Sequence, residues 1–370
     1  MKIKSLLIGS AAALVAAPAL AADVIIAEPE PVEYVEVCDV AGAGYFYIPG
    51  SRTCLQISGL VRHQLNFQED QDGWDSLVRG EVNFRTYTET ELGALTSFIR
   101  FRGNDVNSDP LDIAVTRDDN ASITEVNNIS VNGSVLLNNA VIGLGGLSLG
   151  LSDSLYDGGI AGEFDAFGGN RVHFVRYTAD LGAFSASISA EVERESESRN
   201  DFIPNVVGSL AGDIGAFSVD LAAYYADEDE EGPFLSDQTD DEFGAKIRLG
   251  FDFGPAAIAA GATYNSGDTN GDYDNDYEYS VAASATVGLG EKASLTFGGQ
   301  YFANALVGSE ANDDSDRYSI GANVNYEVVE GFDVLVAVTY VENVFSDELE
   351  DLVGEQDGNL SGFIRFDRSF

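Results

Sequence analysis

The chain has 370 residues, and its 19 basic and 62 acidic residues give a formal net charge of −43. This charge argues against a nucleic-acid-binding protein, whose surface would be basic, and two Cys, two His and one Met leave little material for a metal centre or a thiol catalyst. Charged residues make up 22% of the chain and the mean hydropathy is −0.03, values that a transmembrane β-barrel can have because only every second strand residue meets lipid.

Residues 1–22 are predicted to be a secretory signal peptide. Lys2 and Lys4 precede an apolar stretch, and Ala19-Leu20-Ala21 has the small-residue pattern of a cleavage site. The alternative, a buried N-terminal helix, would need neither the lysines nor the cleavage pattern. No later run of about 18 apolar residues follows, so no helical membrane span is expected after processing.

Residues 23–53 are expected to form a periplasmic lead-in. Cys38 and Cys54 flank a block rich in Gly and aromatic residues, positions 42–50, with no His nearby. In an oxidising compartment an even pair of cysteines predicts a disulfide rather than two free thiols. Closing a loop of about 15 residues would stabilise the fold by about 3 kcal/mol on the chain-entropy model.

Residues 54–370 are predicted to form an all-β, antiparallel transmembrane β-barrel. Apolar and polar residues alternate over segments of about 9 to 13 residues, the length of a tilted strand that crosses a bilayer. Aromatic residues at the strand ends indicate girdles at the membrane interfaces. The alternative, a soluble β-sandwich, would bury too little on both faces. The alternation is clearest at positions 55–67, 184–192, 217–225, 243–251 and 318–326.

Short turns that contain Gly alternate with long polar loops along this segment. The turns lie near residues 91–94, 143–146, 180–183, 213–216, 252–255, 288–291 and 329–331. The loops lie near residues 68–75, 104–124, 154–170, 195–204, 227–241, 266–276, 304–316 and 344–357. These seven turns and eight loops join sixteen strands, and short periplasmic turns with long extracellular loops are typical of outer-membrane barrels.

The loops also hold much of the negative charge. Nearly half of the 62 acidic residues lie at positions 69–75, 227–242, 268–278, 310–316 and 342–357. Positions 267–278 look like a calcium loop, but Tyr273 stands where an EF-hand needs Gly and Tyr279 where it needs Glu. We therefore expect no metal site and no cofactor, and at most weak binding of divalent cations at the acidic loops.

Five arginines of the first three strands lie on the face opposite the apolar residues: Arg62, Arg79, Arg85, Arg100 and Arg102. A lipid-facing Arg costs about 2 to 4 kcal/mol at the bilayer midplane, so the alternation and the energetics both place these guanidiniums in the lumen. Lys246 and Arg248 lie on one face of a later strand, and the alternation points this face into the lumen as well. For any one Arg, the alternative is a charge at a turn or at the membrane interface.

No catalytic set is recognisable in the sequence. His63 and His173 lie far apart without partner Cys or His residues, and no Ser, His and Asp combination stands out. The chain is therefore not expected to be an enzyme.

Several blocks together resemble the general porins of alphaproteobacteria. They are Val32–Cys38 (VEYVEVC), Gly42–Gly50 (GAGYFYIPG), Cys54–Gly59 (CLQISG), Gly145–Asp157 (GGLSLGLSDSLYD) and the terminal Phe370. The likeness covers nearly all of the mature chain, and its N-terminal block is the specific part. A final aromatic residue after an alternating strand looks like the signal read by the barrel-assembly machinery.

The resemblance implies a homotrimeric, sixteen-stranded porin of the cell outer membrane, embedded in outer-membrane lipid, whose third long loop, Tyr156–Asn170, folds into the pore. Asp157, Glu163 and Asp165 of that loop would then face the arginine wall, and a transverse electric field would result. Asn104–Asn127 has no family pattern, so the fourth strand is expected to start between Glu125 and Ser134.

The expected function is a passive, water-filled diffusion channel for ions and small hydrophilic solutes. An alternative is a substrate-selective outer-membrane channel, with saturable conductance or an aromatic track along its lumen. A less favoured alternative is a non-conducting structural or adhesive barrel, whose lumen would be plugged by paired charges. Small Ser, Gly and Asn residues on most polar faces favour an open channel.

Overall fold

The computed structural model describes residues 35–69, 73–106, 114–117, 123–127, 135–193, 203–226, 242–266, 273, 277–305, 315–344 and 358–370. The predicted signal peptide and most of the acidic loop segments lie outside these residues. No helix in the described ranges is long and apolar enough to cross a membrane.

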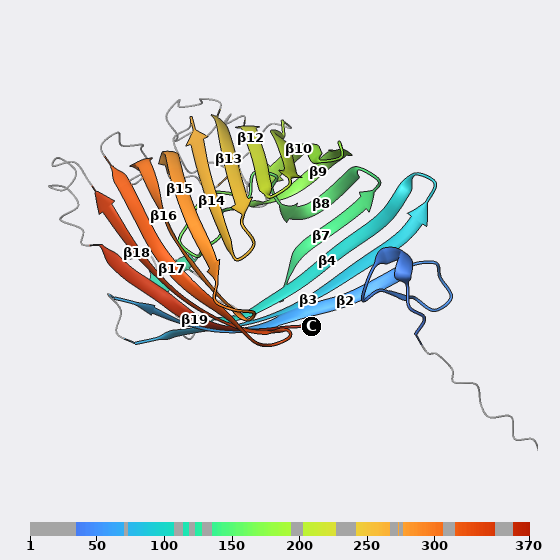
Figure 1. Ribbon diagram of the computed structural model, residues 1–370, viewed down its shortest axis with the longest axis horizontal. Helices are drawn as coiled ribbons and strands as arrows, with labels where there is room; N and C mark the ends of the chain where they lie inside the picture. The colour runs from blue at the N-terminus through green and yellow to red at the C-terminus, as the bar shows by residue number, and fades with distance from the viewer. Residues whose placement is uncertain are drawn as a thin grey trace, which may run out of the picture.

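Sixteen antiparallel strands form a closed β-barrel, as the sequence predicts (Figure 1). They are β2 (Cys54–Gln68), β3 (Asp75–Thr90), β4 (Gly93–Val106), β7 (Val135–Leu144), β8 (Leu147–Asp153), β9 (Arg171–Asp180), β10 (Phe184–Glu193), β11 (Asn205–Ile214), β12 (Phe217–Ala226), β13 (Glu242–Asp252), β14 (Ala256–Asn265), β15 (Tyr277–Gly288), β16 (Ala293–Ala305), β17 (Asp316–Val329), β18 (Phe332–Val344) and β19 (Asn359–Ser369). Each pairs with the next along the chain, and closure removes the free edges that an open sheet would expose.

The barrel closes where its last strand pairs with its first. β19 runs antiparallel to β2 from Ser361 opposite Gln68 to Ser369 opposite Leu60. The terminal Phe370 extends this seam by two backbone hydrogen bonds, since its N–H donates to the carbonyl of Gly59 at 3.1 Å and its carbonyl accepts from the Gly59 N–H at 2.8 Å. A Cβ at Gly59 would lie 2.4 Å from the Phe370 ring, so this position requires glycine.

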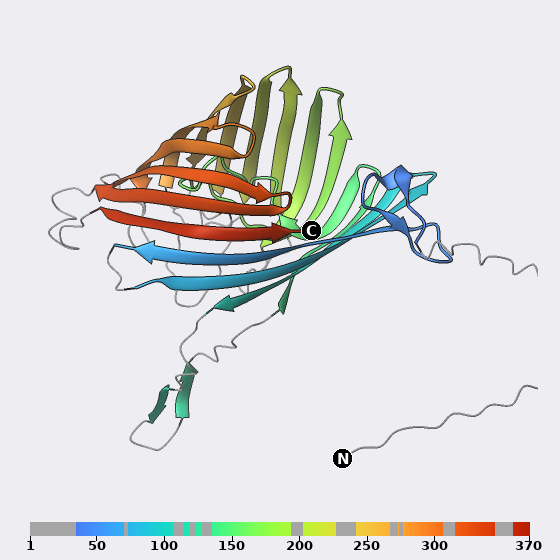
Figure 2. The same ribbon diagram turned by 60° about the horizontal axis from the view of Figure 1, so that its bottom comes forward.

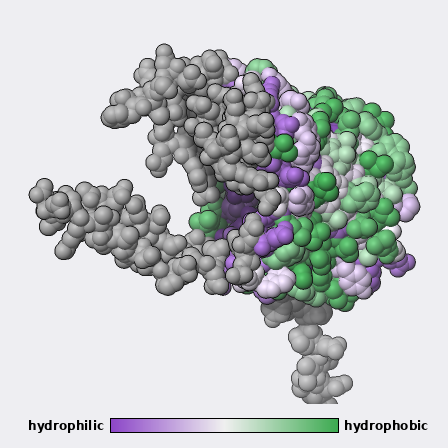
Figure 3. All heavy atoms as spheres, turned by 90° about the vertical axis from the view of Figure 1, so that its left-hand side faces the viewer, coloured by the Kyte–Doolittle hydropathy of each residue, from purple (hydrophilic) through white to green (hydrophobic). Residues whose placement is uncertain are grey.

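The two faces of the wall have opposite polarity. Large apolar side chains are exposed on the outer face, among them Val61, Val78, Ile142, Ile188, Ile258 and Ile320. In Figure 3 apolar residues cover the outer wall, and polar residues gather toward the opening. An apolar outer band around a polar interior is the arrangement that a bilayer-spanning barrel requires.

Tight turns join the strands at one end of the barrel. The turn between β11 and β12 contains Gly215 with φ 65°, and the turn between β17 and β18 contains Gly331 with φ 73°. Glycine adopts this left-handed conformation without the steric penalty that a Cβ brings. The predicted turn positions therefore match the observed ends of the strands.

The described N-terminal segment packs beside β2. A short 3₁₀ helix, η1 (Asp39–Ala41), and a short strand, β1 (Phe46–Tyr47), precede the barrel, and β1 pairs with the start of β2. Cys38 and Cys54 form the predicted disulfide, which ties this segment to the first residue of β2.

The segment between β4 and β7 was the least predictable part of the chain. It contains a separate two-stranded hairpin of β5 (Ala114–Arg117) and β6 (Ile123–Asn127) (Figure 2). The fourth barrel strand, β7, is described from Val135. Of the range predicted for its start, Glu125 to Ser134, residues 125–127 belong to β6 and residues 128–134 lie outside the described residues.

Candidate functional site

The five arginines predicted for the lumen lie together on three neighbouring strands. Arg62 of β2 is opposite Arg79 of β3, and Arg85 and Arg100 pair in register with Phe98 and Asn83 on the same face. Arg102 is opposite Glu81. Because Val78 and Val82 of β3 are exposed on the other face, these guanidiniums point into the barrel.

These five arginines are called the basic wall below. Two carboxylates that were not predicted lie beside them. Glu81 is only 7% exposed and accepts a hydrogen bond from Nε of Arg102 at 2.6 Å, with Nε of Arg100 at 3.6 Å. Asp367 of β19 accepts two hydrogen bonds from Arg62, at 2.7 and 2.8 Å. The alternation along each strand could have identified both as inward-facing residues. Glu81 lies two residues after Arg79, on the same face of β3, and Asp367 follows the apolar Phe366, on the opposite face of β19.

Arg79, Arg85 and Arg100 are held mainly by neutral groups. Arg79 donates to Oδ1 of Asn104 at 2.8 Å, and Arg100 donates to Oδ1 of Asn83 at 2.9 Å. The guanidiniums of Arg85 and Arg100 lie 4.6 and 5.3 Å from the centroid of the Phe98 ring. Such contacts fix the position of a guanidinium without cancelling its charge.

A Phe-x-Arg pattern recurs on the inner face. The pattern occurs as Phe98 and Arg100, Phe174 and Arg176, and Phe363 and Arg365. The distance from the ring centroid to the guanidinium carbon is 4.4 Å in the second pair and 4.9 Å in the third. The sequence alternation puts both members of each pair on one face. Arg365 belongs to the basic wall through its neighbour Asp367, at 3.5 Å, and had not been predicted.

The loop between β8 and β9, residues 154–170, contacts the inner face of the opposite wall. The amide of Gln300 in β16 both accepts from the Ala166 N–H at 2.7 Å and donates to the Ala166 carbonyl at 2.9 Å. Arg248 of β13 donates to the Gly159 carbonyl at 3.1 Å, and Thr339 of β18 donates to the Glu163 carbonyl at 3.2 Å. These bonds are distributed along the loop from one end to the other.

A buried carboxylate anchors the start of this loop. Glu191 of β10 is 0% exposed and accepts from the hydroxyl of Ser154 at 2.5 Å and from the Leu155 N–H at 3.2 Å. Its other neighbours are Arg176, at 3.4 Å, and the hydroxyl of Tyr273, at 3.4 Å. Hydrogen bonds to a charged group are among the stronger ones in proteins, so the loop begins from a fixed point.

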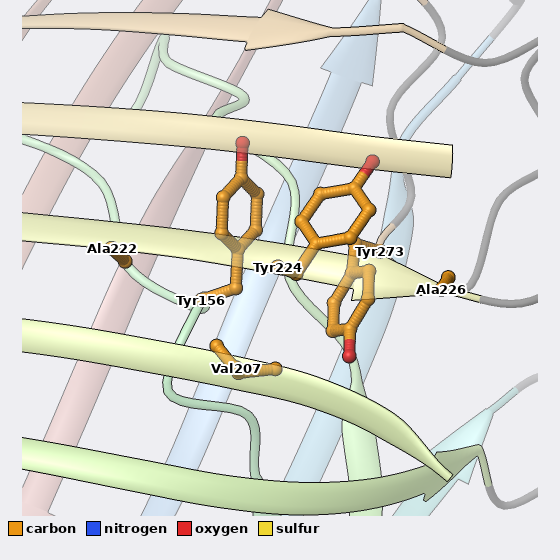
Figure 4. Packing of buried hydrophobic residues seen from close by; sticks show 6 residues of the cluster. All are labelled: Tyr156, Val207, Ala222, Tyr224, Ala226 and Tyr273. Carbon is orange, nitrogen blue, oxygen red and sulfur yellow. The ribbon is translucent and has the colours of Figure 1, made fainter. Parts of the chain in front are cut away.

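An aromatic cluster packs beside this anchor (Figure 4). The ring of Tyr156 lies 4.8 Å from that of Tyr224 and 5.6 Å from that of Tyr273, between centroids. Val207, Ala222 and Ala226 complete the cluster. Burial raises the pKa of the Tyr156 hydroxyl, so this side chain stays neutral.

The three predicted carboxylates of the loop have different surroundings. Glu163 accepts from Arg365 at 2.7 Å, and Asp165 accepts from the backbone N–H of Ile160 at 2.9 Å. Burial raises the pKa of Asp165, and burial together with the nearby Asp153 raises that of Asp157. Within the described residues, no ion pair joins these carboxylates directly to the five predicted arginines; Glu163 meets that wall through Arg365.

The loop leaves space beside it. A pocket of about 360 Å³ lies between Glu163–Asp165 and the strands β2, β18 and β19. Its lining includes Asn66, Thr339, Ser361 and Phe363. The loop therefore narrows the interior on one side without filling it.

The two histidines take no part in this site. His63 lies on the outer face of β2 and stacks on Phe366 with ring centroids 6.4 Å apart, and His173 is exposed on β9. Among the described residues no three His, Cys, Asp or Glu side chains are grouped as a metal site would need. Of positions 267–276, only Tyr273 is described.

Comparison with known proteins identifies the barrel. The family model described as Porin subfamily matches residues 23–358. The chain belongs to this porin family. Porin Omp2a of Brucella melitensis is 35% identical over 402 aligned residues, which cover 100% of both chains. Outer membrane protein IIIA of Rhizobium leguminosarum bv. viciae is 31% identical, over 92% of this chain and 90% of that protein.

Solved structures agree with this porin in fold. In-vitro folded OmpT of Vibrio cholerae matches with a TM-score of 0.57 and 14% identity, over 87% of this chain and 99% of that one. An anion-selective porin from Comamonas acidovorans matches with a TM-score of 0.56 and 12% identity, over 86% and 100%. The predicted family is thus confirmed: the protein is an outer-membrane porin, and its relatives are channels.

Proposed function

We propose that this porin is a passive and non-specific diffusion channel, in which the loop of residues 154–170, called the constriction loop below, narrows the pore opposite the basic wall. The supporting observation is the separation of charge. Arg79, Arg85 and Arg100 are held mainly by neutral groups on one wall. Glu163 and Asp165 lie on the loop inside the barrel, and Glu163 is bound by Arg365 at the edge of that wall.

Opposed charges across a narrow aqueous passage create a transverse field. Such a field orients polar solutes and penalises apolar ones, and it needs no tight binding site. The acidic loops that the sequence predicts would raise the local cation concentration at the mouth, but exposed charges are screened over about 8 Å at physiological ionic strength. We therefore propose a modest preference for cations that weakens as the salt concentration rises.

Single-channel recording in planar bilayers tests this function. The purified protein should form stable open channels with a conductance that rises linearly with salt, and a salt gradient should give a small cation-selective reversal potential. An absence of conductance would instead support a plugged, structural barrel. Heat-modifiable migration on gels verifies that the barrel is folded before each recording.

A substrate-selective channel is the second candidate, and the pocket beside the constriction loop favours it. The ring of Phe363 and the polar groups of Asn66, Thr339 and Ser361 together resemble the lining of a site for a hydroxylated solute. A selective channel would show a current that saturates or is blocked as such a solute is added. A non-specific channel would show neither effect.

We also propose that the protein is a homotrimer. His63 lies on the outer face near the middle of β2, where in a monomer it would meet lipid. A second copy that covers this face would remove that contact. The V. cholerae OmpT structure is described in a trimer form. Gel migration before and after boiling, with cross-linking in detergent, tests this assembly.

A further inference from the structure

Lys246 makes an unusual set of contacts with the constriction loop. It lies on the inner face of β13 and is 2% exposed. Its ammonium donates to the carbonyl oxygens of Tyr156 at 2.5 Å, Gly158 at 3.2 Å and Gly168 at 2.9 Å. An ammonium has three N–H donors, so every donor of Lys246 is used on this one loop.

These three carbonyls come from both ends of the loop. Tyr156 and Gly158 precede Glu163 and Asp165, and Gly168 follows them. One ammonium therefore joins the outgoing and returning halves of the loop and fixes both to β13. The rings of Tyr156 and Phe167 add cation–π contacts, with their centroids 4.2 and 5.9 Å from the nitrogen.

This arrangement separates Lys246 from the other cations of the lumen. A buried charge is stable only where hydrogen bonds and dipoles replace its water, and here the carbonyls of the loop replace it. Because the ammonium is covered by the loop, its charge is not presented to solutes in the lumen. The neighbouring Arg248, by contrast, is partly exposed and pairs with Asp220 at 3.1 Å.

The wall around Lys246 is also shaped to receive the loop. Gly261 of β14 faces the Phe167 ring: a Cβ added at Gly261 would lie 2.6 Å from that ring, and its three nearest heavy atoms would all belong to Phe167. Gly321 of β17 faces Phe164, and a Cβ there would lie 2.7 Å from the Phe164 Cβ. Neither glycine has a positive φ, so the close approach of a Phe side chain of the loop, rather than the backbone conformation, explains why glycine fits at these positions.

We propose that Lys246 is a positioning residue: it binds the backbone carbonyls of the constriction loop as a tethered cation and thereby sets the width of the pore, rather than selecting ions by its charge. This inference rests on the proposed function of the loop as the constriction. The Phe167 ring over Gly261 is a second, uncharged attachment of the same loop.

The test compares conductance with ion selectivity in two variants. Lys246→Met keeps the length of the side chain and removes its charge, and Gly261→Val displaces Phe167 without changing any charge. Both variants should show a noisier current and a single-channel conductance raised on the order of twofold, because a released loop no longer narrows the lumen. Lys292→Met and Gly80→Val are the controls, since Lys292 is exposed at a turn and a Cβ at Gly80 meets nothing.

The outcomes separate the two roles. If Lys246→Met shifts the reversal potential toward cations with an unchanged, quiet conductance, Lys246 selects ions and the proposal is wrong. A wild-type current from Gly261→Val would also contradict it, and this variant decides the matter if Lys246→Met fails to show heat-modifiable folding. A wild-type protein that does not conduct would refute the proposed function itself, which is a different result.

Discussion

Arg365 of the last barrel strand donates from Nη2 to Oε1 of Glu163 in the constriction loop at 2.7 Å, although the two residues are 202 positions apart. Arg365 also lies 3.5 Å from Asp367, which in turn holds Arg62. The loop and the basic wall are therefore linked by a chain of alternating charges. A change at any member alters the field of the next one.

Neutralising the loop carboxylates should lower the preference for cations. In Glu163→Gln with Asp165→Asn, the guanidinium of Arg365 loses its carboxylate partner, so a positive charge is freed where a negative one is removed. The reversal potential in a salt gradient should shift toward anions at low salt. Glu291→Gln with Asp252→Asn, at two tight turns, is the matched control. An unchanged potential at low salt would show that these carboxylates do not border the passage.

Removing the three arginines that are held mainly by neutral groups should raise the preference for cations. Replacing Arg79, Arg85 and Arg100 by Ser leaves Glu81 paired with Arg102 at 2.6 Å, so the barrel should still fold while the wall loses three positive charges. Cation selectivity should increase, most clearly at low ionic strength, where screening is weakest. A variant with Arg52, Lys292 and Arg368 changed to Ser removes the same charge outside the predicted wall. Equal shifts in both variants would contradict a specific role for the wall.

As the pH falls, cation selectivity should begin to drop at a higher pH than it would if the loop carboxylates had ordinary pKa values. Burial raises the pKa of Asp157 and Asp165, so both lose their charge at a higher pH than an exposed Asp, whose pKa is about 3.9. Their neutral form favours the folded loop, and this contribution is present at low pH and lost as the pH rises through the raised pKa values. Reversal potentials measured between about pH 7 and 4 should show this step, and Asp157→Asn with Asp165→Asn should remove it. A step that persists in the double variant would assign it to other groups.

Arg102 should matter more for stability than Arg79. Glu81 is 7% exposed, and Arg102→Ser removes its nearest partner, whereas Arg79→Ser removes a contact to the amide of Asn104. We expect Arg102→Ser to cost about 1 to 3 kcal/mol, measured as a lower midpoint of heat modification in detergent. Adding Glu81→Gln should restore much of the loss. If the two single variants melt alike, the pair between Arg102 and Glu81 contributes little.

The features that could be predicted from sequence are those that alternation determines. The inward face of Arg62 to Arg102 follows from a period of two. Glu81 and Asp367 also lie on the inward faces of their strands, so the same reasoning could have predicted them. Their partners were not, because ion pairing across strands depends on register, which places Glu81 opposite Arg102.

The constriction loop shows where such prediction ends. A loop has no period, and its attachments are backbone carbonyls, which every residue possesses. That Lys246 would bind the carbonyls of Tyr156 and Gly168 depends on the path of the loop through the barrel.

The pairing of Phe370 with Gly59 has a consequence for biosynthesis. β2 is the first barrel strand to be made and β19 follows the other fifteen in chain order, so the seam between them cannot form until β19 has been translated. A product of premature termination would lack β19 and would keep two unpaired strand edges, at β2 and β18. Such a fragment could neither close nor satisfy its backbone in lipid. The seam thus makes barrel closure depend on the synthesis of β19, so only a chain that contains this strand can form a sealed cylinder.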